Sequence, residues 1–389
     1  MGKNVTAALA ADSSCESSEN IATLCSKDKD KGMQCGSDSS MIAASTWRIH
    51  NLLTANELVF ESWLAMSARG LFLTYAIPSI SSVLTHTGGF NKDVARRYAD
   101  MELLIREFNE CAIDGTTSHD GMPHRAKLAC HRLNAIHSQY AKVITYRDMV
   151  YVLCIFALSP STWFGSRWSW RDTTPQERQC IFLHWANIGA ELGLDIRSHF
   201  KSWDDMRGYK AAFEAKHMRY AASNKTVGYS TIDFFVHGTI PTFLQSTVRP
   251  VVLQLMSILQ ETPQHAEALG LPKANPILAV IVDVLLTTRA VLCKYLLPPR
   301  PLSFKDRLTG VEGHESKQIA TKEVFGISKC PFSVQYRPRR PLDFNNTTYS
   351  PEGTPGSAYT IENMGPASVE IGKLEEKPQY LGSKEKHII

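Results

Sequence analysis

The fold class is decided by residues 174–193, which read TPQERQCIFLHWANIGAELG. Thr174 is a residue type that caps helices, and Pro175 suits the first helical position. The Glu177 side chain can bind the backbone amide of the cap, which completes a capping box. Apolar residues then recur at helical spacing, and Gly193 is a typical stop signal. These features predict one long helix with a defined start and end.

The same helical spacing extends in both directions, from residue 47 to about residue 297, and the alternation typical of strands is scarce. Glycine and proline breaks divide this span into about ten helices, and no repeated period points to a solenoid. The predicted fold is all-α, a single large multi-helix domain at residues 46–345. Residues 1–45 and 346–389 are polar or lack apolar periodicity, so both are predicted to be disordered tails.

The composition narrows the class of protein. Of 389 residues, 43% are hydrophobic and 21% are charged, which excludes a wholly disordered chain. The formal net charge of +4 is too small to indicate a basic surface for binding nucleic acid. The mean hydropathy of -0.18 excludes a polytopic membrane protein. The longest apolar stretch, 277–297, contains Asp283, Arg289 and Lys294. Charges are costly at the bilayer centre, so this stretch predicts a buried or interfacial helix rather than a membrane span.

The cysteines and the first residues predict an intracellular protein. The nine cysteines form no CxxC pair, so a zinc ribbon or a thioredoxin-type site has no support. Residues 1–45 contain no apolar core of a secretory signal, although Gly2 loosely fits the pattern for N-myristoylation. Four cysteines in apolar helical patterns are predicted to be reduced core residues: Cys111, Cys130, Cys154 and Cys180.

Conventional catalytic motifs are absent from the sequence: it has no P-loop, no dinucleotide fingerprint, no nucleophile elbow and no HExxH. It does contain one Glu-x-x-His pair, Glu214 and His217. A helical di-iron site needs this pattern twice. A non-haem iron site built from His131, Glu214 and His217 is therefore a minor alternative.

Residues 132–140, RLNAIHSQY, put one histidine on an apolar helix face. An imidazole there must find a hydrogen-bond partner or stay neutral. A hydrogen-bonded core histidine is the ordinary explanation for His137, but a haem iron also requires a neutral imidazole on an apolar wall. His131 is the neighbouring candidate, turned about 120° around the helix. The face of His137 comprises Leu133, Ile136, Tyr140 and Ile144.

A second candidate stretch contains Arg97, Asp100 and Met101, which align at i, i+3 and i+4 on a helix. A surface pair is the ordinary interpretation of this spacing. The functional interpretation is a polar group beside a cofactor, with Arg97 paired to a propionate carboxylate.

An ordered series of motifs resembles the mpaB-like family, fungal haem oxygenases of the mycophenolic acid pathway that share a catalytic domain with bacterial latex-clearing rubber oxygenases. The motifs that carry this resemblance are residues 74–80, 97–100, 132–138, 157–163, 170–178, 217–218, 223–224 and 297–300. The resemblance implies a helical domain that encloses one haem b. It implies His137 as the iron ligand, and Arg97 and Arg132 as further cofactor-binding residues.

The resemblance also implies catalytic positions for Asp100 and Met101. Asp100 stands where rubber oxygenases have a lysine, and Met101 stands where many relatives have a threonine. The glutamate that rubber oxygenases place upstream is missing, because residues 79–82 stand there instead.

The implied activity is haem-dependent oxygenation or oxidative cleavage of a prenyl or other apolar side chain in fungal secondary metabolism. Its partners would be dioxygen, a small apolar or prenylated substrate and, peripherally, the endoplasmic reticulum membrane; a purely cytoplasmic location is the other expectation. The alternative is a non-enzymatic helical haem-binding or scaffold paralogue. Five aromatic residues are candidates for a substrate channel, although aromatic residues at such spacing are ordinarily core: Trp163, Phe164, Trp168, Trp170 and Trp185.

Overall fold

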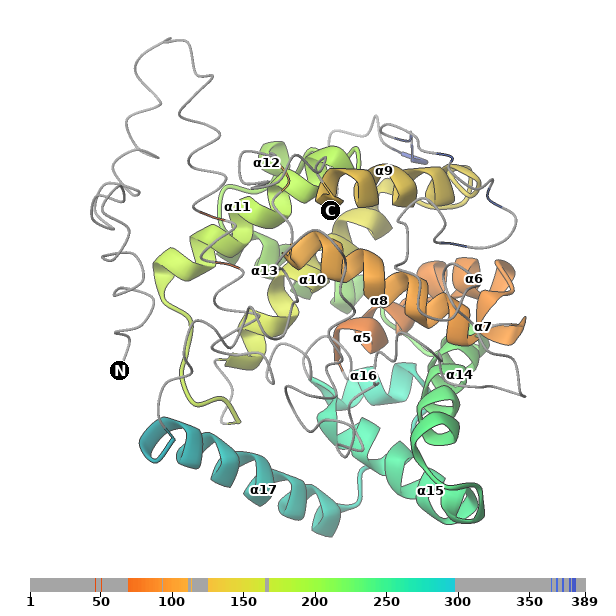
Figure 1. Ribbon diagram of the computed structural model, residues 1–389, viewed down its shortest axis with the longest axis vertical. Helices are drawn as coiled ribbons and strands as arrows, with labels where there is room; N and C mark the ends of the chain where they lie inside the picture. The colour runs from red at the N-terminus through yellow and green to blue at the C-terminus, as the bar shows by residue number, and fades with distance from the viewer. Residues whose placement is uncertain are drawn as a thin grey trace.

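The described part of the chain is built from helices alone, as Figure 1 shows, and contains no strand. This computed structural model describes residues 46, 50, 69–92, 94–110, 113, 125–164, 168–297, 365, 369, 373, 378 and 380–382, with only the backbone for some helix residues. The predicted all-α fold class is confirmed. The predicted tail at 1–45, and residues 301–345, lie outside the described residues.

The helices follow one another closely along the chain. Their bounds are α5 Leu71–Tyr75, α6 Pro78–His86, α7 Gly89–Lys92, α8 Val94–Glu110, α9 Arg125–Ser138, α10 Tyr146–Phe164, α11 Pro175–Glu191, α12 Ile196–His199, α13 Trp203–His217, α14 Ala222–Thr239, α15 Thr242–Leu259, α16 Pro263–Ala268 and α17 Pro276–Tyr295.

The start and end of α11 follow from its local sequence. The Thr174 side chain accepts a hydrogen bond from the Glu177 amide, and the Glu177 side chain accepts one from the Thr174 amide. Pro175 is the first helical residue, and Gly193 adopts a φ of 77°, a left-handed conformation that glycine tolerates. The predicted capping box and stop signal are both confirmed.

Two hydrophobic clusters form the core. The larger draws on α9, α10, α11 and α13, and the smaller on α5, α7, α8, α14 and α16. Helix α8 packs on α9, α10 packs on α13 and α11, and α14 packs on α6, α8 and α15. The thiols of Cys130, Cys154 and Cys180 are reduced and buried, as predicted. Cys111 lies outside the described residues.

The end of α9 differs from the sequence prediction. The helix stops at Ser138, and the Tyr140 amide donates to the His137 carbonyl in the turn that follows. Tyr140 and Ile144 therefore do not continue the helical face of His137. The apolar spacing that suggested a longer helix comes from a turn that packs Ile144 against the larger core cluster.

Part of the predicted C-terminal tail is packed against the domain. Thr145 and Leu381 form an isolated parallel bridge, with hydrogen bonds from the Tyr146 amide to the Leu381 carbonyl and from the Leu381 amide to the Ile144 carbonyl. Val369 and Tyr380 are buried in the larger core cluster. The prediction of disorder at 346–389 does not hold at these positions, because the segment buries apolar side chains; the rest of that tail lies outside the described residues.

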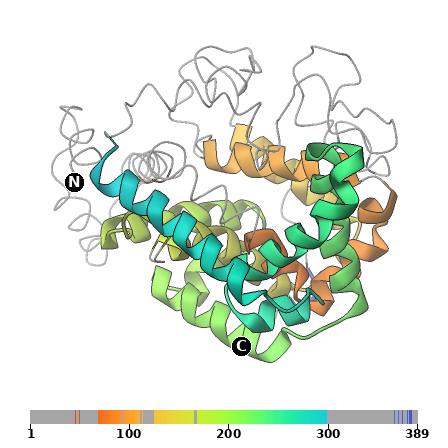
Figure 2. The same cartoon turned by 90° about the horizontal axis from the view of Figure 1, so that it is seen from below.

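One described helix, α17, is long and apolar enough to cross a membrane, with a mean hydropathy of 2.0 over its apolar window, of which 11% is buried. Figures 1 and 2 show α17 along the outside of the molecule. Its exposure contradicts a buried helix, one of the two alternatives that its charged residues predicted.

Candidate functional site

His137 lies in the last turn of α9. Its Nδ1 is 3.3 Å from the hydroxyl oxygen of Tyr380, and the two rings meet edge to face. Burial lowers the pKa of His137 to about 3, and the positive charge of Arg97 lowers it further. The imidazole is therefore neutral at ordinary pH. Within the described part of the chain no hydrogen bond engages Nε2, so this nitrogen keeps its lone pair or proton for another group.

Arg97 reaches the same region from α8, the helix that packs on α9. Its Nε is buried and has no hydrogen-bond partner among the described residues. The side-chain carbons of Arg97 pass close to Gly89, where an added Cβ would lie 3.6 Å from Arg97 Cδ. A buried guanidinium nitrogen without a partner is costly, so Arg97 is set to bind an acceptor that the described chain does not supply.

Asp100 and Met101 follow Arg97 on the same stretch of α8. Asp100 is buried, and Met101 is partly buried against the smaller core cluster. The predicted alignment of these three residues on one helix is therefore present.

Tyr75 adds a residue that the sequence did not single out. Its side chain is 1% exposed, and its hydroxyl has no hydrogen-bond partner in the described residues. Burial raises the pKa of Tyr75 to about 12, while Thr231 and the charge of Arg97 act in the opposite direction. Thr231 Oγ1 itself donates to the Val227 carbonyl. We call His137, Arg97, Tyr75 and Tyr380 the His137 cluster.

Aromatic rings adjoin the His137 cluster on the side of α5, α8 and α14. Tyr75 meets Phe90 edge to face with ring centroids 5.6 Å apart, and Tyr98 contacts both Phe234 and Phe235. These rings belong to, or pack against, the smaller core cluster. An apolar substituent of a ligand would find its natural neighbours here.

The predicted channel aromatics lie elsewhere. Trp168 and Trp185 are buried in the larger core cluster, and Trp170 packs against its edge. Their positions confirm the ordinary interpretation as core residues. The side chains of Trp163 and Phe164 lie outside the described residues.

His131 and Arg132 have partners outside the four residues of the His137 cluster. His131 Nε2 lies 3.6 Å from a carboxylate oxygen of Glu191 on α11. Arg132 is 1% exposed and donates from its guanidinium to the Lys373 carbonyl of the C-terminal segment. Arg132 thus holds the segment that carries Tyr380.

The three residues of the alternative non-haem iron site are not brought together. Glu214 pairs with Lys210 at 3.0 Å and His131 with Glu191, while His217 packs against Phe213. Glu214 does lie near Glu261 and His265, a set whose ligand atoms fall within 4.8 Å of one another. The ammonium of Lys210, 2.7 Å from Glu261, already supplies the positive charge that a metal ion would bring.

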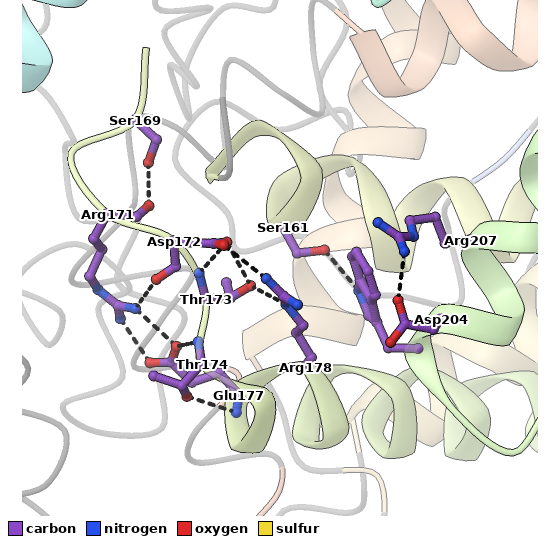
Figure 3. Close-up of polar contacts among 11 residues, drawn as sticks. Ser161, Ser169, Arg171, Asp172, Thr173, Thr174, Glu177, Arg178, Asp204 and Arg207 are labelled. Carbon is purple, nitrogen blue, oxygen red and sulfur yellow. Dashed lines mark hydrogen bonds and ion pairs between the residues drawn. The ribbon is translucent and has the colours of Figure 1, made fainter. Parts of the chain in front are cut away.

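Residues 171–178, at the start of α11, form a second polar cluster, drawn in Figure 3. Arg171 donates to both carboxylate oxygens of Glu177, and Arg178 binds Asp172 and the hydroxyl of Thr173. We call these residues, with Thr174, the α11 cap cluster. Each of its charged groups has a partner of opposite charge, so the cluster fixes the entry to α11.

Comparison with known proteins gives named relatives. No family model matches the chain. The chain is similar to the ER-bound oxygenase mpaB' of Penicillium brevicompactum, with 29% identity over 245 residues that cover 59% of this chain and 54% of the relative. It is 27% identical to the ER-bound oxygenase mpaB of the same species over 245 residues, which cover 59% of this chain and 52% of the relative. It is 30% identical to the ER-bound oxygenase mpaB of Penicillium roqueforti (strain FM164) over 205 residues, which cover 49% of this chain and 64% of the relative.

The match spans about half the length of the first two relatives. The further link to rubber oxygenases stays a prediction from sequence. The three comparisons confirm the predicted resemblance: the chain is similar to fungal proteins named ER-bound oxygenases mpaB and mpaB'.

Proposed function

We propose that the chain is a haem b-dependent oxygenase that oxygenates or cleaves a prenyl or other apolar side chain in fungal secondary metabolism. One observation carries the proposal: the imidazole of His137, kept neutral by burial, lies within the field of Arg97, whose buried Nε has no hydrogen-bond partner among the described residues. The names of the three relatives support the class of reaction, since each is called an oxygenase.

The residues present fit a haem. A haem iron takes a neutral imidazole nitrogen, and propionates take cationic donors. Tyr380 engages Nδ1 of His137, which leaves Nε2 for the iron, and the buried Nε of Arg97 offers a donor to a carboxylate. When bound, the haem would supply the activation of dioxygen.

Each residue of the His137 cluster then has a distinct task. Tyr380 would orient the imidazole by accepting a hydrogen bond from Nδ1–H, in the tautomer whose Nε2 is the ligating atom. Arg97 neutralises a propionate, and the Tyr75 hydroxyl offers a second buried donor. Asp100 and Met101 are proposed to lie beside the reacting atoms. Arg132 supports the haem site indirectly, because it binds the C-terminal segment that carries Tyr380.

The proposed substrate is a small apolar or prenylated compound, taken together with dioxygen. The aromatic rings of α5, α8 and α14 support this class, because they present apolar faces next to Arg97 and Tyr75. Such faces bind isoprenoid chains by burial and exclude water from the reaction.

A second candidate function is a haem-binding or scaffold protein without catalysis. It is favoured by the stretch where rubber oxygenases have a glutamate. Ser79 donates to Asp148, Ser81 donates to the Asn224 side chain, and Ser82 donates to the Ser79 carbonyl. These hydroxyls serve the packing of α6, and none of them is a base.

We place the protein inside the cell, at the periphery of the endoplasmic reticulum membrane. The relatives named ER-bound support this location, and so does an apolar helix on the outside of the domain.

The test is expression with haem supplied, followed by an absorption spectrum and a turnover assay with a farnesylated aromatic compound under dioxygen. A Soret band with an oxygenated or chain-shortened product is the expected result. A Soret band without product would favour the scaffold, and a colourless protein would refute both haem functions.

A further inference from the structure

The outward face of α17 is apolar along its whole length. Ile277 is 72% exposed, Leu285 is 64% exposed and Tyr295 is 66% exposed. The exposed large apolar residues recur at helical spacing, so they form one stripe. They are Ile277, Val280, Ile281, Val284, Leu285, Val291, Leu292 and Tyr295.

The two charged residues in the middle of α17, Asp283 and Arg289, lie on the other side of the helix. Asp283 accepts a hydrogen bond of 2.7 Å from the indole nitrogen of Trp168, a buried core residue. Val282 and Ala290 are buried on the same side, and Arg289 is partly buried. A helix whose outer face meets water shows the opposite arrangement, with charges outward and apolar residues inward. With its apolar residues outward and its central charges inward, α17 is suited to contact with an apolar medium outside the protein.

Because α17 lies on the outside of the molecule, its apolar stripe can contact an extended surface such as a membrane. Figure 1 shows α17 at the lower edge of the molecule, and Figure 2 shows it across the face seen from below; α15 packs against it. Helix α15 adds exposed apolar residues of its own, with Phe243 79% exposed and Val251 46% exposed. Exposed apolar residues on two helices that pack together indicate an interaction site rather than ordinary surface.

The charges at the ends of α17 select the partner. Lys273 precedes the helix, Lys294 lies in its last turn, and both are exposed. Residues 273–300 contain four basic residues and one acidic residue, and the acidic one is Asp283, which is bound to Trp168. Tyr295 stands at the end of the stripe with Lys294 5.3 Å from its ring centroid. Basic residues and a tyrosine at the ends of an apolar stripe match the headgroup region of a bilayer with anionic lipids.

We propose that α17 lies flat in the interface of a lipid bilayer and, with α15, docks the domain on the membrane. A membrane-spanning α17 is incompatible with the fold, because Val282, Asp283 and Ala290 bind the helix to the domain along its middle. This inference rests on the peripheral membrane association proposed above and names its surface. It does not depend on haem or on substrate.

The test is flotation of the full chain with vesicles of phosphatidylcholine, with and without phosphatidylinositol. The double variant Ile281→Gln, Leu285→Gln changes two outward residues of α17, and its matched control Val143→Gln, Tyr220→Gln changes two equally exposed residues elsewhere. The wild type should float, and more strongly with the anionic lipid. The α17 variant should lose about tenfold or more in vesicle binding, whereas the control should float as the wild type does.

Three results would overturn the inference. A wild type that does not float would refute the membrane association itself. Equal flotation of the α17 variant would refute the surface assignment alone. Self-association of the wild type that the α17 variant abolishes, without vesicle binding, would show that a second copy covers the stripe. Circular dichroism of each variant shows whether its helices are intact, and the exposed positions chosen leave the core untouched.

Discussion

The α11 cap cluster and the His137 cluster both contain buried polar groups, yet they differ in how these groups are hydrogen-bonded. Around Arg171 and Glu177, each charged group has a partner of opposite charge and the backbone amide of Thr174 is capped (Figure 3). Around His137, Arg97 Nε and the Tyr75 hydroxyl have no hydrogen-bond partner in the described residues. Burial of polar groups costs free energy unless they are bonded. The first cluster therefore stabilises the fold, and the second has buried groups that the proposed haem would engage.

The largest effect on stability is expected from Glu177→Ala. The substitution leaves Arg171 without its bidentate partner and removes one half of the capping box. Breaking a buried pair in this way costs about 3–5 kcal/mol in the free energy of unfolding, which chemical denaturation measures. The matched control is Asp204→Ala, which removes an exposed pair with Arg207 and should cost less than about 1 kcal/mol. Equal losses in the two variants would contradict the structural role of the α11 cap cluster.

Arg97→Met should show the opposite pattern. Because Arg97 Nε is buried without a partner in the described chain, the ligand-free protein should lose no unfolding free energy, while its affinity for haem should fall by about tenfold, the loss expected for one charge-assisted bond. Haem titration and denaturation measure the two effects. Arg178→Met is the control, since Arg178 is bound to Asp172 and should affect stability but not haem. A destabilised Arg97→Met with unchanged haem affinity would remove Arg97 from the site.

Acid should weaken a third, fully bonded cluster, that of Glu214. Desolvation raises the pKa of Glu214, but hydrogen bonding from His265 and the charge of Lys210 outweigh it and hold the pKa below its ordinary value. A carboxylate with a lowered pKa stabilises the fold above its unfolded-state pKa, and that contribution disappears as the pH falls through the lower, folded-state pKa. Unfolding free energy should therefore drop as the pH falls below about 4.5, the ordinary value. Glu214→Gln should flatten this dependence, and an unchanged slope would contradict the assignment.

The smallest effect is expected from Tyr75→Phe. The substitution removes a buried hydroxyl that has no partner among the described residues, so the free energy of unfolding of the ligand-free protein should stay the same or rise by up to about 1 kcal/mol. Tyr209→Phe is the control, because the equally buried Tyr209 donates to the Arg147 carbonyl and its loss should cost about 1 kcal/mol. A clear destabilisation by Tyr75→Phe would show that its hydroxyl is bonded in the folded chain.

The sequence predicts those structural features that depend only on residues close together along the chain. The capping box of Thr174 and Glu177 and the stop at Gly193 involve residues a few positions apart, and the structure has both. The end of α9 at Ser138 was missed, since no glycine or proline marks it and the apolar spacing continues into the turn.

The residues that complete the His137 cluster could not be predicted in this way. Tyr380 lies 243 positions from His137, in a segment whose composition indicated disorder. Tyr75 stands in an apolar run, where a tyrosine has the pattern of a core residue, and only its missing hydrogen bond distinguishes it. The apolar stretch of α17 was recognised, but which of its faces is outward depends on the bond between Asp283 and Trp168, 115 positions apart.

The central claim is that His137 holds a haem iron, and the absorption spectrum of His137→Ala after expression with haem tests it most directly. Alanine favours the helix more than histidine does, so α9 should survive while the iron loses its protein ligand. His131→Ala is the matched control on the same helix, since His131 binds Glu191 instead. The account predicts that the Soret band is lost in His137→Ala and kept in His131→Ala. Full haem occupancy and an unchanged spectrum in His137→Ala would contradict it.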